Sequence, residues 1–331
     1  MNTNFQAMVV RQSEDKQFTR SIEERKIDDL PKGDVLVRVH FSSLNYKDGL
    51  SSVGTRGVTR NYPHTPGIDA AGIIESSSSP EFKTGDSVIV TSYDLGMNTS
   101  GGFGQFIRVP SDWVVPLPEG MSLKESMIYG TAGYTAGLTL NALLNQELTP
   151  EKGPMVVTGA SGGVGSVATA LLAGLGFQVM ASSGKSDAED FLKEIGASEI
   201  IGREAVNDDS GKALIKQAWA GGVDTVGGNA LSTLIKACNS GGAIAVTGNV
   251  ASPELPITVF PFILRGVNLL GIDSQNTPMP LRRKVWKKIG GEWKPKNLER
   301  LAKECTLDQL DAEIEQILKG GQTGRVLINL Q

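Results

Sequence analysis

The chain has 331 residues, about twice the usual length of one domain, so two domains are expected. Its net charge of -4 and pI near 5.4 give no overall basic field for nucleic acid. Two cysteines are too few for a disulfide framework or a thiolate zinc site, and no apolar leader or long apolar span is present, which predicts a cytoplasmic protein with no membrane partner.

Short apolar runs rich in β-branched residues dominate the first part of the chain. Gly, Pro and Asp separate them, as expected for strands joined by turns. The predicted strands span residues 7–11, 34–43, 67–76, 87–92 and 106–109. From residue 126 onward, helical and strand patterns alternate, which predicts an α/β domain with a doubly wound parallel sheet.

A glycine-rich turn, Gly159 to Gly165, lies between a predicted strand at 155–158 and a predicted helix at 164–175. Glycines in this position let the backbone approach a pyrophosphate, whose charge is met by N–H groups at the helix start. The spacing is Gly-x-x-Gly-x-x-Gly rather than Gly-x-Gly-x-x-Gly, so a simple tight loop stays open as an alternative. The residues predicted to bind a dinucleotide here are Ser161, Gly162, Gly163 and Val164.

The end of the next predicted strand, 177–181, indicates which dinucleotide binds. An NAD enzyme usually has an acidic residue there for the ribose 2′-hydroxyl. This chain instead has Ser182, Ser183, Gly184 and Lys185. Hydroxyls and a cation suit a 2′-phosphate, so NADPH is the predicted cofactor. Arg203, after the strand pattern at 198–201, either reaches the same phosphate or is a solvated surface residue.

Further strands are predicted at 223–226, 243–248, 268–272 and 325–330, with a helix at 307–318. Asn249 and Ser274 each follow the end of a strand, where ligands bind in open α/β sheets. We therefore expect both to contact the cofactor, the alternative being that they satisfy loop backbone.

Several motifs occur in the order found in one superfamily of oxidoreductases. They are Ser43–Asp48, Pro66–Gly72, Lys83–Asp86, Gly130–Ala136, Gly222–Gly228 and Pro261–Ser274. Together they resemble the medium-chain dehydrogenase/reductases, and within these the zinc-free YhdH/YhfP quinone oxidoreductase family, which includes acrylyl-CoA reductase. The resemblance implies a GroES-like β-rich catalytic domain, residues 1–125 completed by about 288–331, and a Rossmann domain at 126–287, with the active cleft where they meet.

The resemblance also implies that the metal positions of the zinc-dependent relatives are altered. Asn45-Tyr46 and Asp69 stand where those relatives have zinc ligands, and the two histidines, His40 and His64, are far apart in the chain. No metal is therefore predicted. Without a Lewis acid, hydride transfer is restricted to acceptors that are already electrophilic. The prediction is an NADPH-dependent reductase of an enoyl thioester or enone, with a quinone reductase or a non-catalytic NADPH-binding protein as alternatives.

The candidate catalytic residues are Tyr46, as donor to the substrate, and Asn45, as a second donor. The alternative for Tyr46 is that it only packs on the cofactor. The alternative for Asn45 is that its side chain forms hydrogen bonds with the backbone of a local turn. Asp69 is interpreted as structural. The resemblance implies that Thr131 faces the nicotinamide; otherwise it is a helix cap.

Two further expectations concern partners. Basic residues at 282–288, together with Lys47, Arg56 and Arg60, either bind the phosphates of a CoA thioester or form solvated faces. The apolar segments 259–264 and 268–272 exceed what one strand needs, and the resemblance implies a homodimer in which this edge pairs with its copy.

Overall fold

The computed structural model describes residues 4–331, which divide into two compact units. The first contains residues up to Thr131 together with Gln275–Gly291 and Ala302–Gln331, and the second contains Ala132–Ser274 and Glu292–Leu301. In this division residues 275–287 belong to the first unit, whereas the sequence predicts that they belong to the Rossmann domain.

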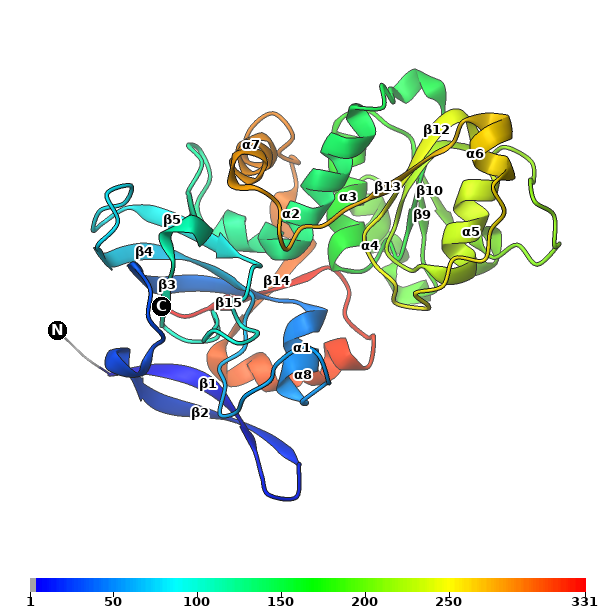
Figure 1. Cartoon of the computed structure of the whole chain (residues 1–331). Coiled ribbons are helices and arrows are strands. Elements are labelled where there is room, and N and C mark those ends of the chain that lie inside the picture. The colour runs from blue at the N-terminus through cyan, green and yellow to red at the C-terminus, as the bar shows by residue number, and fades with distance from the viewer. Residues whose placement is uncertain (1–3) are drawn as a thin grey trace. The chain divides into compact units, whose positions relative to one another are not determined.

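The first unit is built around a seven-stranded sheet with the order β14-β15-β3-β4-β5-β7, in which β6 also pairs with β3. A separate hairpin is made of β1 and β2 (Figure 1). The strands are β1 Asn4–Gln12, β2 Phe18–Lys26, β3 Val35–Leu44, β4 Asp69–Ser77, β5 Ser87–Thr91, β6 Phe106–Val109, β7 Val114–Pro116, β14 Ala302–Thr306 and β15 Arg325–Asn329. Predicted strands 106–109 and 325–330 agree closely, whereas β2, β14 and the three-residue β7 were not predicted.

Burial explains why β2 and β14 gave no sequence signal. Of β2, Phe18–Lys26, no residue is fully buried, and its run of charged side chains lacks the apolar alternation of a half-buried strand. In β14, Ala302–Thr306, only Cys305 is buried. The core of this unit is supplied instead by β3 to β6 and β15, with Leu310 and Ile314 of α8 packed onto it.

The helices of the first unit are α1 Tyr46–Ser52, α7 Met279–Gly290 and α8 Leu310–Leu318. The helix predicted at 307–318 begins with a 3-10 turn, Leu307–Gln309, before α8. Helix α7 contains Pro280 in its first turn, where proline is tolerated. Short 3-10 segments occur at Ile27–Asp29 and Ser111–Trp113.

The second unit has a six-stranded parallel sheet with the order β10-β9-β8-β11-β12-β13. This is the strand order of a Rossmann fold. Strands β9 and β10 are added on one side of β8 and the last three strands on its other side, so the strand order reverses beside β8. The strands are β8 Met155–Thr158, β9 Val179–Ser182, β10 Glu199–Ile201, β11 Trp219–Asp224, β12 Cys238–Val246 and β13 Asn268–Gly271. The prediction of a doubly wound parallel sheet is confirmed.

The helices of the second unit are α3 Gly163–Gly174, α4 Glu189–Glu194, α5 Gly228–Lys236 and α6 Phe260–Arg265, with α3 and α5 on opposite sides of the sheet (Figure 1). Short 3-10 segments occur at Pro150–Lys152, Ser186–Ala188, Arg203–Val206 and Leu298–Leu301. Helix α2, Leu123–Leu144, runs through the division at Thr131 and is interrupted at Gly130, where φ is 52°. The apolar segment 259–264 is helical rather than a strand: Val259 is the N-cap of α6, and residues 260–264 belong to the helix. Pro261 lies in the first turn, where proline is tolerated.

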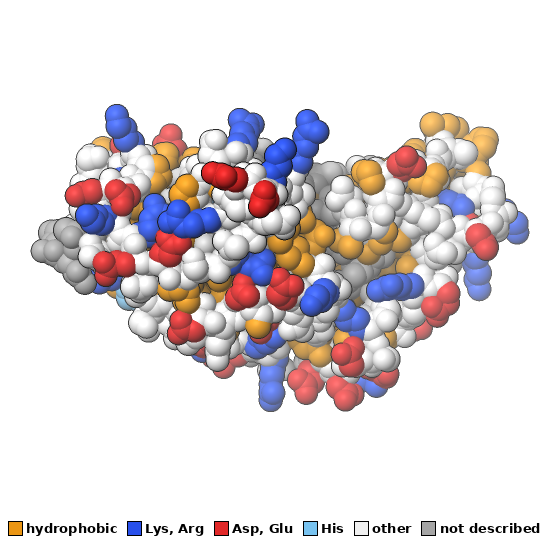
Figure 2. Space-filling view, turned by 90° about the horizontal axis from the view of Figure 1, so that it is seen from below, with side chains coloured by type: hydrophobic (Ala, Val, Ile, Leu, Met, Phe, Trp, Pro, Cys, Tyr) orange, Lys and Arg blue, Asp and Glu red, His pale blue; other side chains and the backbone are white. Residues whose placement is uncertain are grey.

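In the described part of the chain no helix has the length and apolar content to cross a bilayer. Acidic and basic side chains are interspersed on the face shown in Figure 2, in keeping with the small net charge.

Candidate functional site

The start of α1 carries the two predicted catalytic residues. Strand β3 ends at Leu44, Asn45 precedes the helix, and Tyr46 is its first residue. The Tyr46 side chain is 52% exposed, whereas Asn45 is buried. The Asn45 side-chain amide donates to the Asp69 carboxylate at 2.6 Å and to the Ser43 carbonyl at 3.2 Å. Tyr46 is thus accessible, and the N–H groups of Asn45 are used within the protein.

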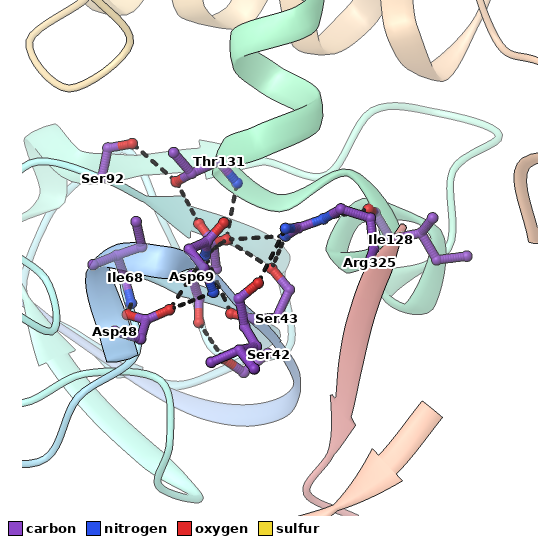
Figure 3. A network of polar contacts seen from close by, with 11 residues as sticks. Ser42, Ser43, Asp48, Ile68, Asp69, Ser92, Ile128, Thr131 and Arg325 are labelled. Carbon is purple, nitrogen blue, oxygen red and sulfur yellow. Dashed lines mark hydrogen bonds and ion pairs between the residues drawn. The ribbon is translucent and has the colours of Figure 1, made fainter. Parts of the chain in front are cut away.

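Asp69, the first residue of β4, is the centre of a buried polar cluster (Figure 3). Besides Asn45, it accepts hydrogen bonds from Ser43 Oγ at 2.7 Å, and from the backbone N–H and hydroxyl of Thr131 at 2.9 and 2.6 Å. Its side chain is fully buried. These contacts join the end of β3, the start of α1 and the middle of α2. We call Ser43, Asn45, Asp48, Asp69, Thr131 and Arg325 the Asp69 cluster.

Arg325, the first residue of β15, supplies the positive charge of this cluster. Its Nη2 lies 3.9 Å from Asp69 Oδ2 and donates to Ser43 Oγ at 2.9 Å. Nη1 donates to the Leu44 carbonyl at 3.0 Å and Nε to the Ile128 carbonyl at 3.3 Å. Burial lowers the pKa of Arg325, and the charges of the neighbouring carboxylates oppose that shift. The guanidinium therefore fixes three segments through directed hydrogen bonds.

Asp48 is the second buried carboxylate of the cluster. It accepts hydrogen bonds from the backbone N–H groups of Asn45 and Ile68 at 2.8 and 2.9 Å. Burial, followed by the charge of Asp69, raises the pKa of Asp48 to about 7. The carboxylate closes the first turn of α1 onto Asn45, so it fixes the residue before Tyr46.

Thr131 follows Gly130, where α2 is interrupted. A Cβ on Gly130 would lie 2.2 Å from Ser43 Oγ and 2.5 Å from Asp69 Oδ2, so only glycine fits between α2 and the cluster. The Thr131 hydroxyl donates to Asp69 and is 3.0 Å from the hydroxyl of Ser92. The hydroxyl is thereby oriented by a buried carboxylate.

The glycine-rich turn connects β8 to α3 in the second unit, as predicted. Gly159 has φ of 58°, and a Cβ there would lie 2.3 Å from Thr225 Oγ1. A Cβ on Gly165 would lie 2.2 Å from the Gly159 carbonyl oxygen. Gly162 precedes α3, and a Cβ there would meet only the Gly159 carbonyl oxygen, at 3.3 Å. These glycines let the turn pack closely, so the N–H groups at the start of α3 can meet a phosphate.

The segment after β9 brings the predicted 2′-phosphate residues together. Ser183 Oγ donates to Ser161 Oγ at 3.2 Å and accepts from the Lys185 N–H at 3.1 Å. Arg203 packs against Gly184 so closely that a Cβ on Gly184 would lie 2.1 Å from Arg203 Nε. Burial lowers the pKa of Lys185; the charge of Asp187 opposes that shift, and the nearby charge of Arg203 adds to it. Two cations beside hydroxyls are suited to a phosphate. We call residues 183–185 with Arg203 the cationic loop.

The two remaining predicted cofactor residues follow β12 and β13. Asn249 is exposed and lies next to Gly227, whose Cβ position is 3.2 Å from the Asn249 Cα. Gly227 has φ of 74° and pairs with Ser252 in an isolated bridge. Ser274 is half-buried, at the end of the second unit. Both lie at the carboxyl end of the parallel sheet, where ligands of such sheets bind.

Within residues 4–331, no group of three or more His, Cys, Asp and Glu side chains has the arrangement of a metal site. His64 is buried and its Nε2 lies 2.9 Å from the Gly96 carbonyl oxygen, whereas His40 contacts Gln331. Asp69 instead accepts four hydrogen bonds and faces Arg325.

The basic residues for which CoA phosphates or solvated faces are the alternatives differ in burial and in contacts. Arg282 is fully buried: it donates to the Thr91 carbonyl at 3.1 Å and its guanidinium carbon lies 4.3 Å from the centre of the Tyr93 ring. The interpretation of Arg282 as a surface cation is therefore wrong. Arg282 lies near the start of α7 on the face that is buried in the core. The sequence shows only a cluster of basic residues and does not indicate which of them is buried. Arg283 pairs with Glu81 at the surface.

Arg325 is the site residue that sequence reasoning missed. The strand pattern at 325–330 identifies it only as the first residue of an apolar strand. An arginine that opens a strand otherwise buried along most of its length is a signal for a buried ion pair, because burying a lone charge is costly.

With this geometry established, comparisons with known proteins define the family. Residues 31–119 match the alcohol dehydrogenase GroES-like domain, and residues 163–289 match the zinc-binding dehydrogenase domain. Over its full length the chain is 46% identical to the putative quinone oxidoreductase YhfP of Bacillus subtilis, with both chains completely covered. It is 43% identical to the acrylyl-CoA reductase AcuI of Ruegeria pomeroyi, covering 98% of this chain and 99% of that protein.

A solved structure shows the same similarity. The crystal structure of the YhdH oxidoreductase from Salmonella enterica in complex with NADP has a TM-score of 0.95 and 40% identity, covering 98% of this chain and all of that one. The chain therefore belongs to the YhfP/AcuI/YhdH group of medium-chain dehydrogenase/reductases, a family of oxidoreductases. The predicted combination of a GroES-like domain and a Rossmann domain is confirmed.

Proposed function

We propose that this protein is an NADPH-dependent reductase that transfers hydride to an activated carbon–carbon double bond, in an enoyl thioester or an enone. The cationic loop carries the cofactor part of the proposal: Arg203 packs on Gly184 beside Lys185, at the strand end that faces the ribose in this fold. Full-length similarity to an acrylyl-CoA reductase supports the acceptor.

For the cofactor, we propose that the turn around Ser161 to Val164 holds the pyrophosphate and the cationic loop holds the 2′-phosphate. NADPH, when bound, supplies the hydride. Asn249, Ser274 and Thr131 are proposed to contact the rest of the cofactor. Changing Ser183 to Asp together with Lys185 to Ala should erase the preference for NADPH over NADH, because it replaces a cation and a hydroxyl with an anion. An unchanged ratio of kcat/KM for the two cofactors would contradict this assignment.

For the chemistry, we propose that the exposed Tyr46 phenol donates a hydrogen bond or a proton to the substrate. Asn45, whose N–H groups are bound to Asp69 and Ser43, then acts by holding the start of α1. Tyr46→Phe is expected to lower kcat about 10- to 100-fold, in the range usual for a lost acid or hydrogen-bond donor. The NADPH dissociation constant, measured by fluorescence, should stay unchanged; if it rises while kcat does not fall, Tyr46 packs on the cofactor instead.

A quinone reductase is the second candidate, supported by the similarity to a putative quinone oxidoreductase over the whole chain. A non-catalytic NADPH-binding protein is the third. The decisive experiment compares NADPH oxidation with acrylyl-CoA, crotonyl-CoA, a simple enone and a quinone. Turnover highest with the enoyl thioesters or the enone supports the proposal, and turnover with the quinone alone supports the second candidate. Tight NADPH binding without turnover on any acceptor would support the third.

We also propose a homodimer in which the β13 edges of two copies pair. The strand β13 lies at the edge of the sheet, and Val259, Phe260, Ile263 and Leu264 of the adjacent segment are between 45% and 67% exposed. Exposed apolar side chains next to an open strand edge are typical of an interface. Light scattering should give a mass twice that of the chain, and Ile263→Glu with Leu264→Glu should give a monomer. A monomeric wild type would overturn the proposal.

A cytoplasmic location is proposed as well, because NADPH-dependent reduction draws on the NADPH pool inside the cell. Cell fractionation with an antibody to the chain tests it, and recovery with the membrane or exported fraction would contradict it.

A further inference from the structure

Lys47, the second residue of α1, is held in place by a neutral partner. Its Nζ donates to Gln275 Oε1 at 2.9 Å, and the side chain is half-buried. Within residues 4–331 its ammonium forms no ion pair with a carboxylate, in contrast to Lys236, which pairs with Asp208. The Lys47 charge is therefore oriented by Gln275 without being neutralised by it.

Gln275 is itself fixed by a buried arginine. Arg282 Nη2 donates to the Gln275 carbonyl at 3.1 Å, while Nη1 donates to both oxygens of Thr91 at 3.1 and 3.2 Å. The Arg282 guanidinium also lies over the Tyr93 ring. Since Arg282 is fully buried, this arrangement holds the backbone of Gln275 against β5, and its amide oxygen presents a fixed acceptor to Lys47.

We propose that Lys47 is a catalytic residue that binds the carbonyl oxygen of the acceptor and stabilises the negative charge that develops there, with Gln275 as its positioning residue. This inference rests on the proposed function. A preorganised cation at the developing charge is one of the largest contributions to catalysis, because it needs no reorganisation when the reaction occurs.

The chemistry of conjugate reduction requires such a group. A hydride from the reduced nicotinamide forms a C–H bond at the β-carbon, the carbon–carbon π bond breaks, and its electron pair moves to the carbonyl oxygen to form an enolate. A proton then adds to the α-carbon, so each turnover consumes one NADPH and one proton. The enolate oxygen carries the developing charge and is the atom assigned to Lys47.

Lys47 and Tyr46 can share this task without competing. An ammonium has three N–H donors, of which Gln275 engages one, so two can bind the carbonyl oxygen. Consecutive residues on a helix point about 100° apart. The phenol of Tyr46 and the ammonium of Lys47 therefore approach different atoms, which fits a proton donor for the α-carbon and an electrostatic group for the oxygen.

The test compares Lys47→Met, Lys47→Arg, Gln275→Leu and the double variant K47M/Q275L, using NADPH with crotonyl-CoA and with a simple enone. K47M is expected to lower kcat about 100-fold with both acceptors, as when an oxyanion donor is removed. K47R should recover most of the loss, because it restores a cation. Q275L should cost about 10-fold, and the double variant should be no slower than K47M, because Gln275 acts through Lys47.

Controls separate this role from others. Lys83→Met removes an exposed lysine of the same unit and should leave kcat unchanged. The NADPH dissociation constant, from tryptophan fluorescence, should not change in K47M; a rise in proportion to the loss of kcat would make Lys47 a cofactor contact and overturn the proposal. A rise in KM for crotonyl-CoA alone, with normal kcat, would make Lys47 an anchor for CoA phosphates and overturn it as well.

The outcome for Lys47 is distinct from the outcome for the proposed function. If the wild type oxidises NADPH with none of the acceptors, the proposed function fails. If the wild type is active and K47M retains kcat within threefold, only the role of Lys47 fails. Additive losses in K47M and Q275L would overturn the assignment of Gln275 as its positioning residue.

Discussion

Two polar regions of this chain differ in how their charges are balanced. In the Asp69 cluster, two carboxylates and one guanidinium are buried, and hydrogen bonds from β3, α1 and α2 converge on Asp69. In the cationic loop, Lys185 and the exposed Arg203 lie near each other and repel, while the charge of Asp187 attracts Lys185. The first region is buried and hydrogen-bonded within the protein, whereas the second places two like charges near each other at the site proposed above for the 2′-phosphate.

This difference predicts different consequences when charge is removed. A side chain taken from the buried cluster leaves its partners desolvated and unsatisfied, so folding suffers. Arg203 of the cationic loop is exposed, so its removal is expected to weaken the binding of an anion more than it weakens folding. Each prediction below tests one side of this comparison.

The largest effect on stability is expected for Asp69→Ala. The change leaves the guanidinium of Arg325 buried without its carboxylate and removes the acceptor for Asn45, Ser43 and Thr131. The free energy of unfolding should fall by about 3–5 kcal/mol, the usual cost of breaking a buried ion pair from one side. Urea denaturation measures it. Asp112→Ala, at an exposed position of the same unit, should stay within about 0.5 kcal/mol, and a loss below about 1 kcal/mol in Asp69→Ala would contradict the prediction.

The next effect depends on pH and concerns Asp48. Its pKa is about 7 in the folded chain against 3.8 when unperturbed, so the folded state holds the proton more tightly. The associated stabilisation is complete below pH 3.8 and is lost as the pH rises through 7. Between pH 4 and pH 8 the stability of wild type should therefore fall relative to Asp48→Asn by up to about 4 kcal/mol.

Denaturation of both proteins across that pH range isolates Asp48, because the other carboxylates are common to the pair. Asp112→Asn, at an exposed position of the same unit, is the control for the substitution itself. A difference between wild type and Asp48→Asn that is flat from pH 4 to pH 8 would show that Asp48 is ionised throughout.

Gly130→Ala tests the packing of α2 against the Asp69 cluster. The added Cβ would lie 2.2 Å from Ser43 Oγ and 2.8 Å from Arg325 Nη2, at a residue with φ of 52°. We expect a loss of about 3 kcal/mol, from backbone strain and from displaced hydrogen bonds. Gly120→Ala is a matched control, since φ is 79° and nothing lies within 4 Å of the new atom. It should cost only about 1 kcal/mol. Equal losses in the two variants would refute a role for the cluster.

The sequence predicted a strand for each of the six in the second unit but none for β2, β7 and β14 of the first, and the reason is physical. Buried parallel strands such as Met155–Thr158 are continuous apolar runs between turn signals, and the glycine-rich turn is a local motif. Residues 183–185 of the cationic loop could be named from their position after β9, and Arg203 from its position after β10.

The Asp69 cluster is different because it is assembled from distant segments. Asp69, Thr131 and Arg325 are separated by 62 and 194 residues in the chain, and no spacing rule brings them together. Arg282 could not be predicted from local sequence either. Its charged neighbours indicate a solvated face, whereas in the fold its side chain is buried and its guanidinium lies over the Tyr93 ring. Which charged side chain is buried depends on tertiary packing, and tertiary packing cannot be read from the neighbouring residues in the sequence.

The smallest expected change in free energy concerns the cationic loop, where binding rather than folding responds. Arg203→Ala and Lys185→Ala should each raise the KM for NADPH about 10- to 100-fold, which corresponds to the loss of one charge-assisted hydrogen bond. The KM for NADH should change little, because NADH has no 2′-phosphate. Arg56→Ala, an exposed arginine of the first unit, is the control. The thermal midpoint of the free protein should change little in Arg203→Ala, because that side chain is exposed. A matching loss for NADPH and NADH would mean that these cations stabilise the loop itself, and the contrast with the Asp69 cluster would then disappear.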